Sequence, residues 1–191
     1  TGAYLQRLAL VEPFIAVSML SGPYIIENQH LISTVLMTNT TPLNPFRGVG
    51  HVQAAFVMER IVDLVAGGVG LDPAEVRFRN MLPNDVFPLH RGIGNVLAGE
   101  IIYDSGDYQA CLTRALEVAD WDGFRAEQER AITDGRHLGI GIGFFVEETG
   151  LGPYESGRVR VEPSGQVVVF TGACSSGQGH DTVLAQITAD E

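Results

Sequence analysis

The stretch FRGVGHVQAAFVMERIVDLVAGGVGLDPAEVRFRN, residues 46–80, carries the strongest structural signals of the chain. Its apolar residues recur at helical spacing, as at Ala54, Met58, Ile61 and Val65, and the charged residues Glu59, Arg60 and Asp63 fall between them. This periodicity predicts a helix over 54–65 that stops at the glycine pair 67–68.

The end of the same stretch predicts a second, shorter helix over 73–81. Asp72 can cap it, Pro73 suits its first position, and Glu75 is placed to complete a capping box.

Upstream of this stretch, the pattern predicts a helix over 11–20, a strand over 31–38 and a polar loop over 39–50. Downstream, it predicts a strand over 100–103 and helices over 107–118, capped by Ser105 or Asp104, and 124–133. Strands over 139–146, 157–161 and 166–171 follow, the last two joined in a hairpin at 163–165, and a helix over 180–189 ends the chain. The fold class is therefore α+β.

Composition excludes several classes of protein. The 191 residues carry 12 basic and 23 acidic side chains, a net charge of −11, which argues against binding to nucleic acid or to an anionic membrane. No apolar run reaches the length of a membrane span. Cys111 and Cys174 stand alone, so we expect no metal site in this chain and a reducing, cytoplasmic location.

Two glycine-rich segments carry the chemical signal: the loop Phe46-Arg47-Gly48-Val49-Gly50 and the turn Gly177-Gln178-Gly179-His180. Each stands before a predicted helix, where backbone amides and the helix dipole favour anionic or acceptor-rich ligands. Arg47 offers a forked donor, and Gln178 offers both a donor and an acceptor. Taken singly, such a segment is more often plain strand-to-helix turn geometry than a site.

Taken together and in this order, the segments resemble the large, molybdenum-binding subunit of the xanthine dehydrogenase/aldehyde oxidase superfamily. The resemblance rests on residues 38–40, 46–50, 53–55, 59–60, 72–77 and 79–80, and then on 139–141, 158–161 and 171–182. It implies two partial mixed α/β lobes, the end of a first cofactor-binding lobe over 1–95 and the start of a second over 96–191. It also implies that the chain is an internal piece of that subunit.

The resemblance further implies a molybdenum hydroxylase with a molybdenum–molybdopterin cofactor, which can carry a dinucleotide tail. Iron–sulfur and FAD groups are expected on partner subunits or domains, and the substrate is a small molecule. The implied cofactor-binding residues are Phe46, Arg47, Gly48, Gly177, Gln178 and Gly179.

Two positions narrow the implied reaction. Purine-oxidising members have an aromatic residue where this chain has Val49, the implied substrate position, and copper-containing carbon monoxide dehydrogenases have cysteine at the position of Gly48. Small aldehydes or N-heterocycles therefore remain as substrates. The family's general base, a glutamate, is expected outside this chain, so we expect the isolated chain to be inactive and to hold cofactor weakly or not at all.

Two other readings stay open at this stage. One is a non-catalytic binding or assembly module, in which the glycine turns are structural and the charge-poor N-terminal part is an interface. The other is a nucleotide-binding enzyme that uses the turn over 172–179, which lacks an acidic ribose ligand further along the sequence.

Overall fold

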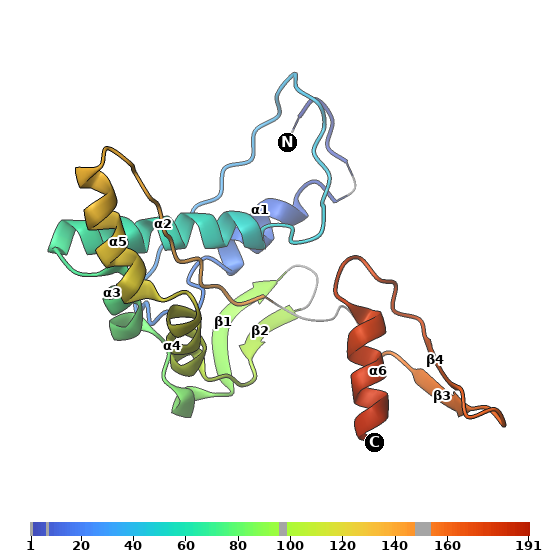
Figure 1. The fold of residues 1–191 in the computed structure, drawn as a ribbon. Helices are drawn as coiled ribbons and strands as arrows, with labels where there is room; N and C mark the ends of the chain where they lie inside the picture. Colours follow the sequence, from blue (N-terminus) through green and yellow to red (C-terminus); the bar gives the residue numbers. More distant parts are fainter. Residues whose placement is uncertain (1, 7, 96–98, 148–153) are drawn as a thin grey trace. The chain divides into compact units, whose positions relative to one another are not determined.

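The computed structural model describes residues 2–6, 8–95, 99–147 and 154–191, and it confirms the α+β class (Figure 1). The chain divides into two compact units, 1–148 and 149–191, each described here by itself. The first unit holds α1 (Val11–Ser18), α2 (His51–Val69), α3 (Pro73–Asn80), a 3₁₀ turn (Asn84–Val86), β1 (Leu89–Asn95), β2 (Gly99–Tyr103), α4 (Tyr108–Val118) and α5 (Trp121–Thr133). The second unit holds β3 (Gly157–Val161), β4 (Val167–Thr171) and α6 (His180–Asp190). The proposed lobe boundary at 95/96 stays a prediction.

The core of the first unit forms where α1, the start of α2 and the β1–β2 hairpin meet. Its buried members are Val11, Ile15, Met19, Ala54, Leu82, Ile101 and Tyr103. Two of these seven side chains, Val11 and Ile15, belong to α1, and Met19 is its C-cap residue, so this short apolar helix is held by packing on its neighbours, as is usual for a helix of eight residues.

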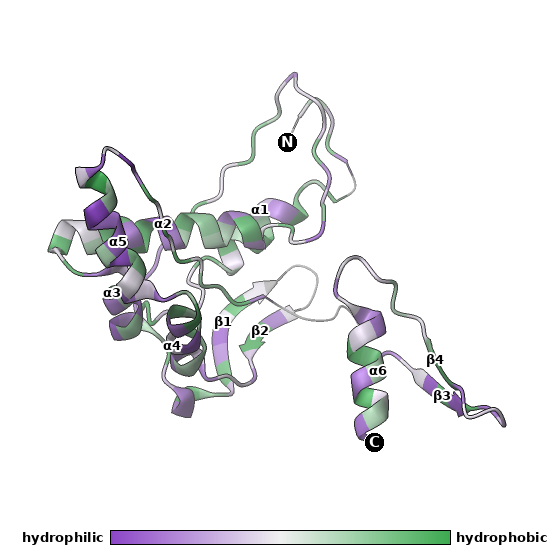
Figure 2. Ribbon diagram, viewed as in Figure 1, coloured by the Kyte–Doolittle hydropathy of each residue, from purple (hydrophilic) through white to green (hydrophobic). Residues whose placement is uncertain are grey.

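Helix α2 is apolar over much of its surface (Figure 2), and its covered side differs from the expected one. Ile61 and Val65, expected on the core side, are 45% and 48% exposed, whereas Ala54, Glu59 and Ala66 are buried. Two of the buried residues are alanines, which allow neighbouring backbone to approach closely. The third is the charged Glu59, which the spacing placed off the apolar side.

The ends of α2 are both set by glycine. Gly50 precedes the helix with φ 74°, and a Cβ there would lie 2.7 Å from the Ala16 nitrogen and the Glu12 oxygen of α1. The helix then continues through the glycine pair 67–68, where we expected it to stop, and ends at Gly70, which has the left-handed φ of 70° that this type of helix end requires.

The expected caps are partly correct. The Asp72 side chain accepts a hydrogen bond from the Ala74 amide at 2.7 Å, as predicted, while Glu75 pairs with Arg79. Helix α4 is capped by Asp107, which accepts from the Ala110 amide at 2.9 Å, and so the prediction of Asp104 or Ser105 is wrong.

Two predicted strands are wrong, and one strand was missed. Residues 31–38 and 139–146 form no strand, although both are rich in β-branched and apolar residues. In the described residues neither segment lies beside a second strand that could complete a ladder. By contrast, β1 pairs antiparallel with β2, from Leu89 opposite Tyr103 to Asn95 opposite Gly99, in a stretch expected to be irregular before residue 100.

The second unit agrees with the sequence pattern. β3 and β4 pair antiparallel from Gly157 opposite Thr171 to Val161 opposite Val167, and their turn is closed by Gly165 at φ 85°. Helix α6 packs against β4. Among the described residues of both units, no helix is long and apolar enough to cross a membrane.

Candidate functional site

The loop Phe46–Gly50 leads directly into α2. Phe46 is 87% exposed and Arg47 is exposed, while Val49 packs against the core. Gly48 adopts φ 84°, and its carbonyl accepts the amide of Val52 in the first turn of the helix at 3.3 Å. The loop therefore holds Val49 inward and presents Phe46 and Arg47 outward.

The position of this loop is fixed from behind by α1. Gly50 is buried against α1 so closely that it has no room for a side chain, and its carbonyl accepts the Ala54 amide at 2.9 Å. Gly50 offers no side-chain cap to α2, and the carbonyls of Gly48 and Gly50 accept the first backbone hydrogen bonds of the helix.

A cavity of about 400 Å³ lies beside Gly48. The first half of α2 forms one wall, and residues 142–147 form another. Most of its lining is apolar, including Val52, Phe56 and Phe145.

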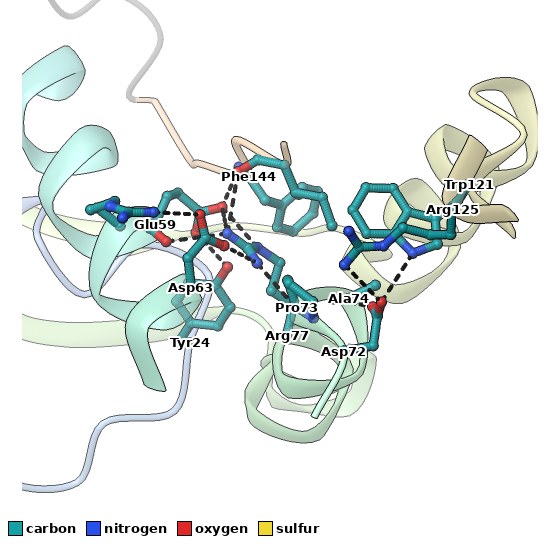
Figure 3. Close-up of polar contacts among 12 residues, drawn as sticks. Tyr24, Glu59, Asp63, Asp72, Pro73, Ala74, Arg77, Trp121, Arg125 and Phe144 are labelled. Atoms are coloured by element: carbon teal, nitrogen blue, oxygen red, sulfur yellow. Dashed lines mark hydrogen bonds and ion pairs between the residues drawn. The ribbon is translucent and has the colours of Figure 1, made fainter. Parts of the chain in front are cut away.

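A buried ion pair lies under this cavity and joins four segments of the first unit (Figure 3). Arg77 of α3 is fully buried, and its guanidinium lies 2.9 Å from the carboxylate of Glu59, which is 6% exposed. The same guanidinium pairs with Asp63 at 3.0 Å and donates to the backbone oxygens of Pro73 at 3.0 Å and Ile142 at 3.2 Å. The groups that pair with Arg77 thus lie on α2, on α3 and in the segment after α5.

Both carboxylate oxygens of Glu59 accept hydrogen bonds. Its Oε1 accepts the Tyr24 hydroxyl at 2.5 Å, and its Oε2 accepts the Phe144 amide at 2.8 Å as well as the Arg77 Nε at 2.9 Å. Burial, together with the hydrogen bond and the charge of Glu59, raises the pKa of the Tyr24 phenol. Burial of Arg77 opposes its charged form, but Glu59 overcomes this and raises the pKa of the guanidinium.

The contacts of Glu59 and Arg77 show how residues 139–146 are held in place without forming a strand. The Ile142 carbonyl and the Phe144 amide bond to the ion pair, and the Leu138 carbonyl accepts the side chain of Gln128 at 2.8 Å. Side chains thus satisfy backbone groups that a neighbouring strand would otherwise satisfy.

A second polar cluster docks α5 onto the start of α3 (Figure 3). The Asp72 carboxylate, besides capping α3, lies 3.4 Å from both the Arg125 guanidinium and the Trp121 indole nitrogen. Arg125 also stacks over the Trp121 ring, 4.9 Å from its centroid.

In the second unit, the turn Gly177-Gln178-Gly179 precedes α6. Gly177 and Gly179 have φ of 98° and 72°, and the Gly179 carbonyl accepts the Thr182 and Val183 amides of the first helical turn. All three residues are exposed, and the Gln178 side chain accepts the Ser176 amide.

The predicted site residues thus fall into two groups, each gathered at a helix start. Phe46, Arg47, Gly48 and Val49 lie in the first unit, and Gly177, Gln178 and Gly179 lie in the second. That both groups meet on one cofactor stays a prediction. The helical spacing did not indicate that Glu59 is buried. A signal for it lies in the acids Glu59 and Asp63, four positions apart, followed by Arg77 on the next helix.

Comparisons with known proteins identify the family of the chain. Two models of the molybdopterin cofactor-binding domain match residues 1–81 and 114–191. The gamma subunit of the 6-hydroxypseudooxynicotine dehydrogenase complex of Paenarthrobacter nicotinovorans is 36% identical over the whole of this chain and 24% of its own length. The carbon monoxide dehydrogenase large chain of Hydrogenophaga pseudoflava is 32% identical over 90% of this chain and 22% of its own length.

A solved structure is similar to this chain as well. Quinoline 2-oxidoreductase of Pseudomonas putida 86 aligns with 99% of this chain and 25% of its own, at 33% identity and a TM-score of 0.73. The chain therefore spans about a quarter of the length of these relatives. With both of its glycine loops inside matched cofactor-binding domains, the chain belongs to the molybdopterin-binding large subunits of the xanthine dehydrogenase/aldehyde oxidase superfamily of molybdenum-dependent oxidoreductases.

Proposed function

We propose that this chain supplies cofactor-contacting loops to a cytoplasmic molybdenum hydroxylase that oxidises an aldehyde or an N-heterocycle. The single observation that carries the proposal is that both predicted loops stand at helix starts inside regions matched by cofactor-binding domains. The relatives include a nicotine 6-hydroxylase large subunit, which supports a heterocyclic substrate, and Gly48 stands at the position where the family resemblance places the cysteine of copper-containing carbon monoxide dehydrogenases.

The donor set of the first loop fits a pterin cofactor. An exposed guanidinium at Arg47 stands beside Gly48, so backbone can approach a ligand there without a Cβ in the way. Such a guanidinium can form forked hydrogen bonds to an anionic or carbonyl group, and the nearby start of α2 favours the same groups. Phe46 and Gly48 would contact the cofactor through their backbone.

The donor set of the second loop fits the other side of such a cofactor. The Gln178 amide presents a donor and an acceptor, which match the edge of a heterocycle, and Gly179 again leaves the backbone open. In this proposal Arg47 and Gln178 bind one pterin, with or without a nucleotide tail.

When bound, the molybdenum–pterin group supplies oxygen-atom transfer and accepts the electrons of the oxidation. The residues of this chain bind and orient that group, while iron–sulfur and FAD partners receive the electrons. Val49 would stand at the substrate position, and the general base would come from outside these residues.

The test is to replace Arg47 and Gln178 by alanine, singly and together, in the full-length protein that contains this chain. A charge-assisted contact of Arg47 is worth about 1.5–3 kcal/mol, so its variant should weaken cofactor retention roughly 10- to 150-fold. A neutral contact of Gln178 is worth about 0.5–1.5 kcal/mol, so its variant should weaken retention roughly 2- to 10-fold. The measurements are molybdenum per protein by elemental analysis, released pterin by fluorescence, and circular dichroism for folding.

Arg114→Ala and Gln166→Ala are the matched controls, since both residues are exposed and lie outside the loops and the cavity lining. Full molybdenum content in the Arg47→Ala/Gln178→Ala protein would refute the assignment of the loops. A correctly folded wild-type protein with neither molybdenum nor pterin would favour the non-catalytic binding module instead.

A further inference from the structure

The cavity beside Gly48 has the size and lining of a small-molecule site. Its volume of about 400 Å³ lies within the range of ligand pockets, and all its lining residues belong to the first unit. Aromatic side chains stand on two of its walls, Phe56 on α2 and Phe145 on the segment that the Glu59–Arg77 pair holds in place. A flat apolar body would therefore be enclosed from two sides.

The charges around the cavity are mostly paired with one another. Glu59 is bound to Arg77 at 2.9 Å, and Asp63 lies 3.0 Å from Arg77 and 3.8 Å from Arg60. In the described part of the chain, the remaining carboxylate of the lining, that of Glu147, takes part in no hydrogen bond or ion pair. The cavity therefore keeps one unneutralised negative charge at its edge.

We propose that this cavity binds a small, mainly apolar amine in its protonated form. The apolar body lies against Phe56 and Phe145, and the ammonium group pairs with Glu147. A carboxylate-bearing molecule of the same shape is disfavoured, because its charge would repel Glu147. The inference rests on the proposed function in one respect: the bound amine is the substrate of the site that the loop Phe46–Gly50 borders.

The experiment measures the dissociation constants of benzylamine, benzyl alcohol and benzoate for the full-length protein by isothermal titration calorimetry. These probes share a ring and differ in charge. Because Glu147 is exposed, benzylamine should bind only about 2- to 5-fold tighter than benzyl alcohol, and benzoate should bind most weakly. Glu147→Gln should abolish the preference for benzylamine. Glu127→Gln, an exposed acid on α5 away from the cavity, should leave it unchanged.

Phe56→Ala locates the site, because this exposed side chain can be removed without emptying the core. It should weaken benzylamine and benzyl alcohol by the same factor. Equal binding of the three probes, a preference that survives Glu147→Gln, or unchanged affinity in Phe56→Ala would overturn the inference. Molybdenum content is measured on the same samples, so that absence of cofactor counts against the proposed function and the probe series alone decides the cavity.

Discussion

Replacing Arg77 by methionine tests the reasoning about the buried ion pair. Methionine keeps the length and much of the volume of the side chain, so the change removes charge and hydrogen bonds and leaves little empty space. It leaves the Glu59 carboxylate, 6% exposed, with only the Tyr24 hydroxyl and the Phe144 amide as donors. It also deprives the Pro73 and Ile142 carbonyls of a donor.

The expected cost follows from that uncompensated charge. Removing one partner of a buried ion pair costs about 3–5 kcal/mol, a large part of the stability of an ordinary domain. Glu59→Gln in the Arg77→Met background removes the remaining charge. The double variant should therefore be more stable than Arg77→Met alone, by about 1–3 kcal/mol.

Trp121 provides the assay, because it is the only tryptophan in the sequence and is buried in the first unit. Its fluorescence during urea titration reports the free energy of unfolding of that unit without interference from the second. Tyr24→Phe serves as a control that removes one hydrogen bond to Glu59 and leaves Arg77 in place. A loss below about 1 kcal/mol in Arg77→Met, or a double variant less stable than Arg77→Met, would contradict the reasoning.

Two further predictions concern the loop before α2 and the alkaline limit of stability. Gly50→Ala should lower the free energy of unfolding by more than about 2 kcal/mol, because the new Cβ would lie 2.7 Å from the backbone of α1 and because Gly50 has a φ of 74°. Gly68→Ala is the control, since nothing lies within 4 Å of a Cβ at that position. Burial, with help from Tyr103 and Asp104, raises the pKa of Tyr108 to about 12, and burial also raises the pKa of Tyr24. Because tyrosines of the unfolded chain ionise near pH ~10, the free energy of unfolding should fall as the pH rises above that value. Urea titrations of Tyr108→Phe should show a shallower fall between about pH 10 and 12, and an unchanged slope would count against the assigned burial.

The sequence predicted those elements whose signals are local. Helix α3 follows from Asp72 and Pro73 alone, and the β3–β4 hairpin follows from two short apolar runs around a glycine turn. The predicted strand over 139–146 failed because strand formation depends on a partner far along the chain. The composition of that segment is strand-like, but its backbone bonds to Arg77, Glu59 and Gln128.

The same distinction applies to the candidate site. Its glycines and Arg47 can be recognised in the sequence because their chemistry resides in the residues themselves. The orientation of the loop depends on tertiary contacts: Gly50 packs against α1, and Glu59 of α2 bonds to α3 and to Phe144. No periodicity in residues 46–65 reveals those contacts, because each partner lies on another element. A short peptide of the loop would therefore keep the donors that a pterin requires but would lose their arrangement, and it should bind such a ligand far more weakly than the folded unit does.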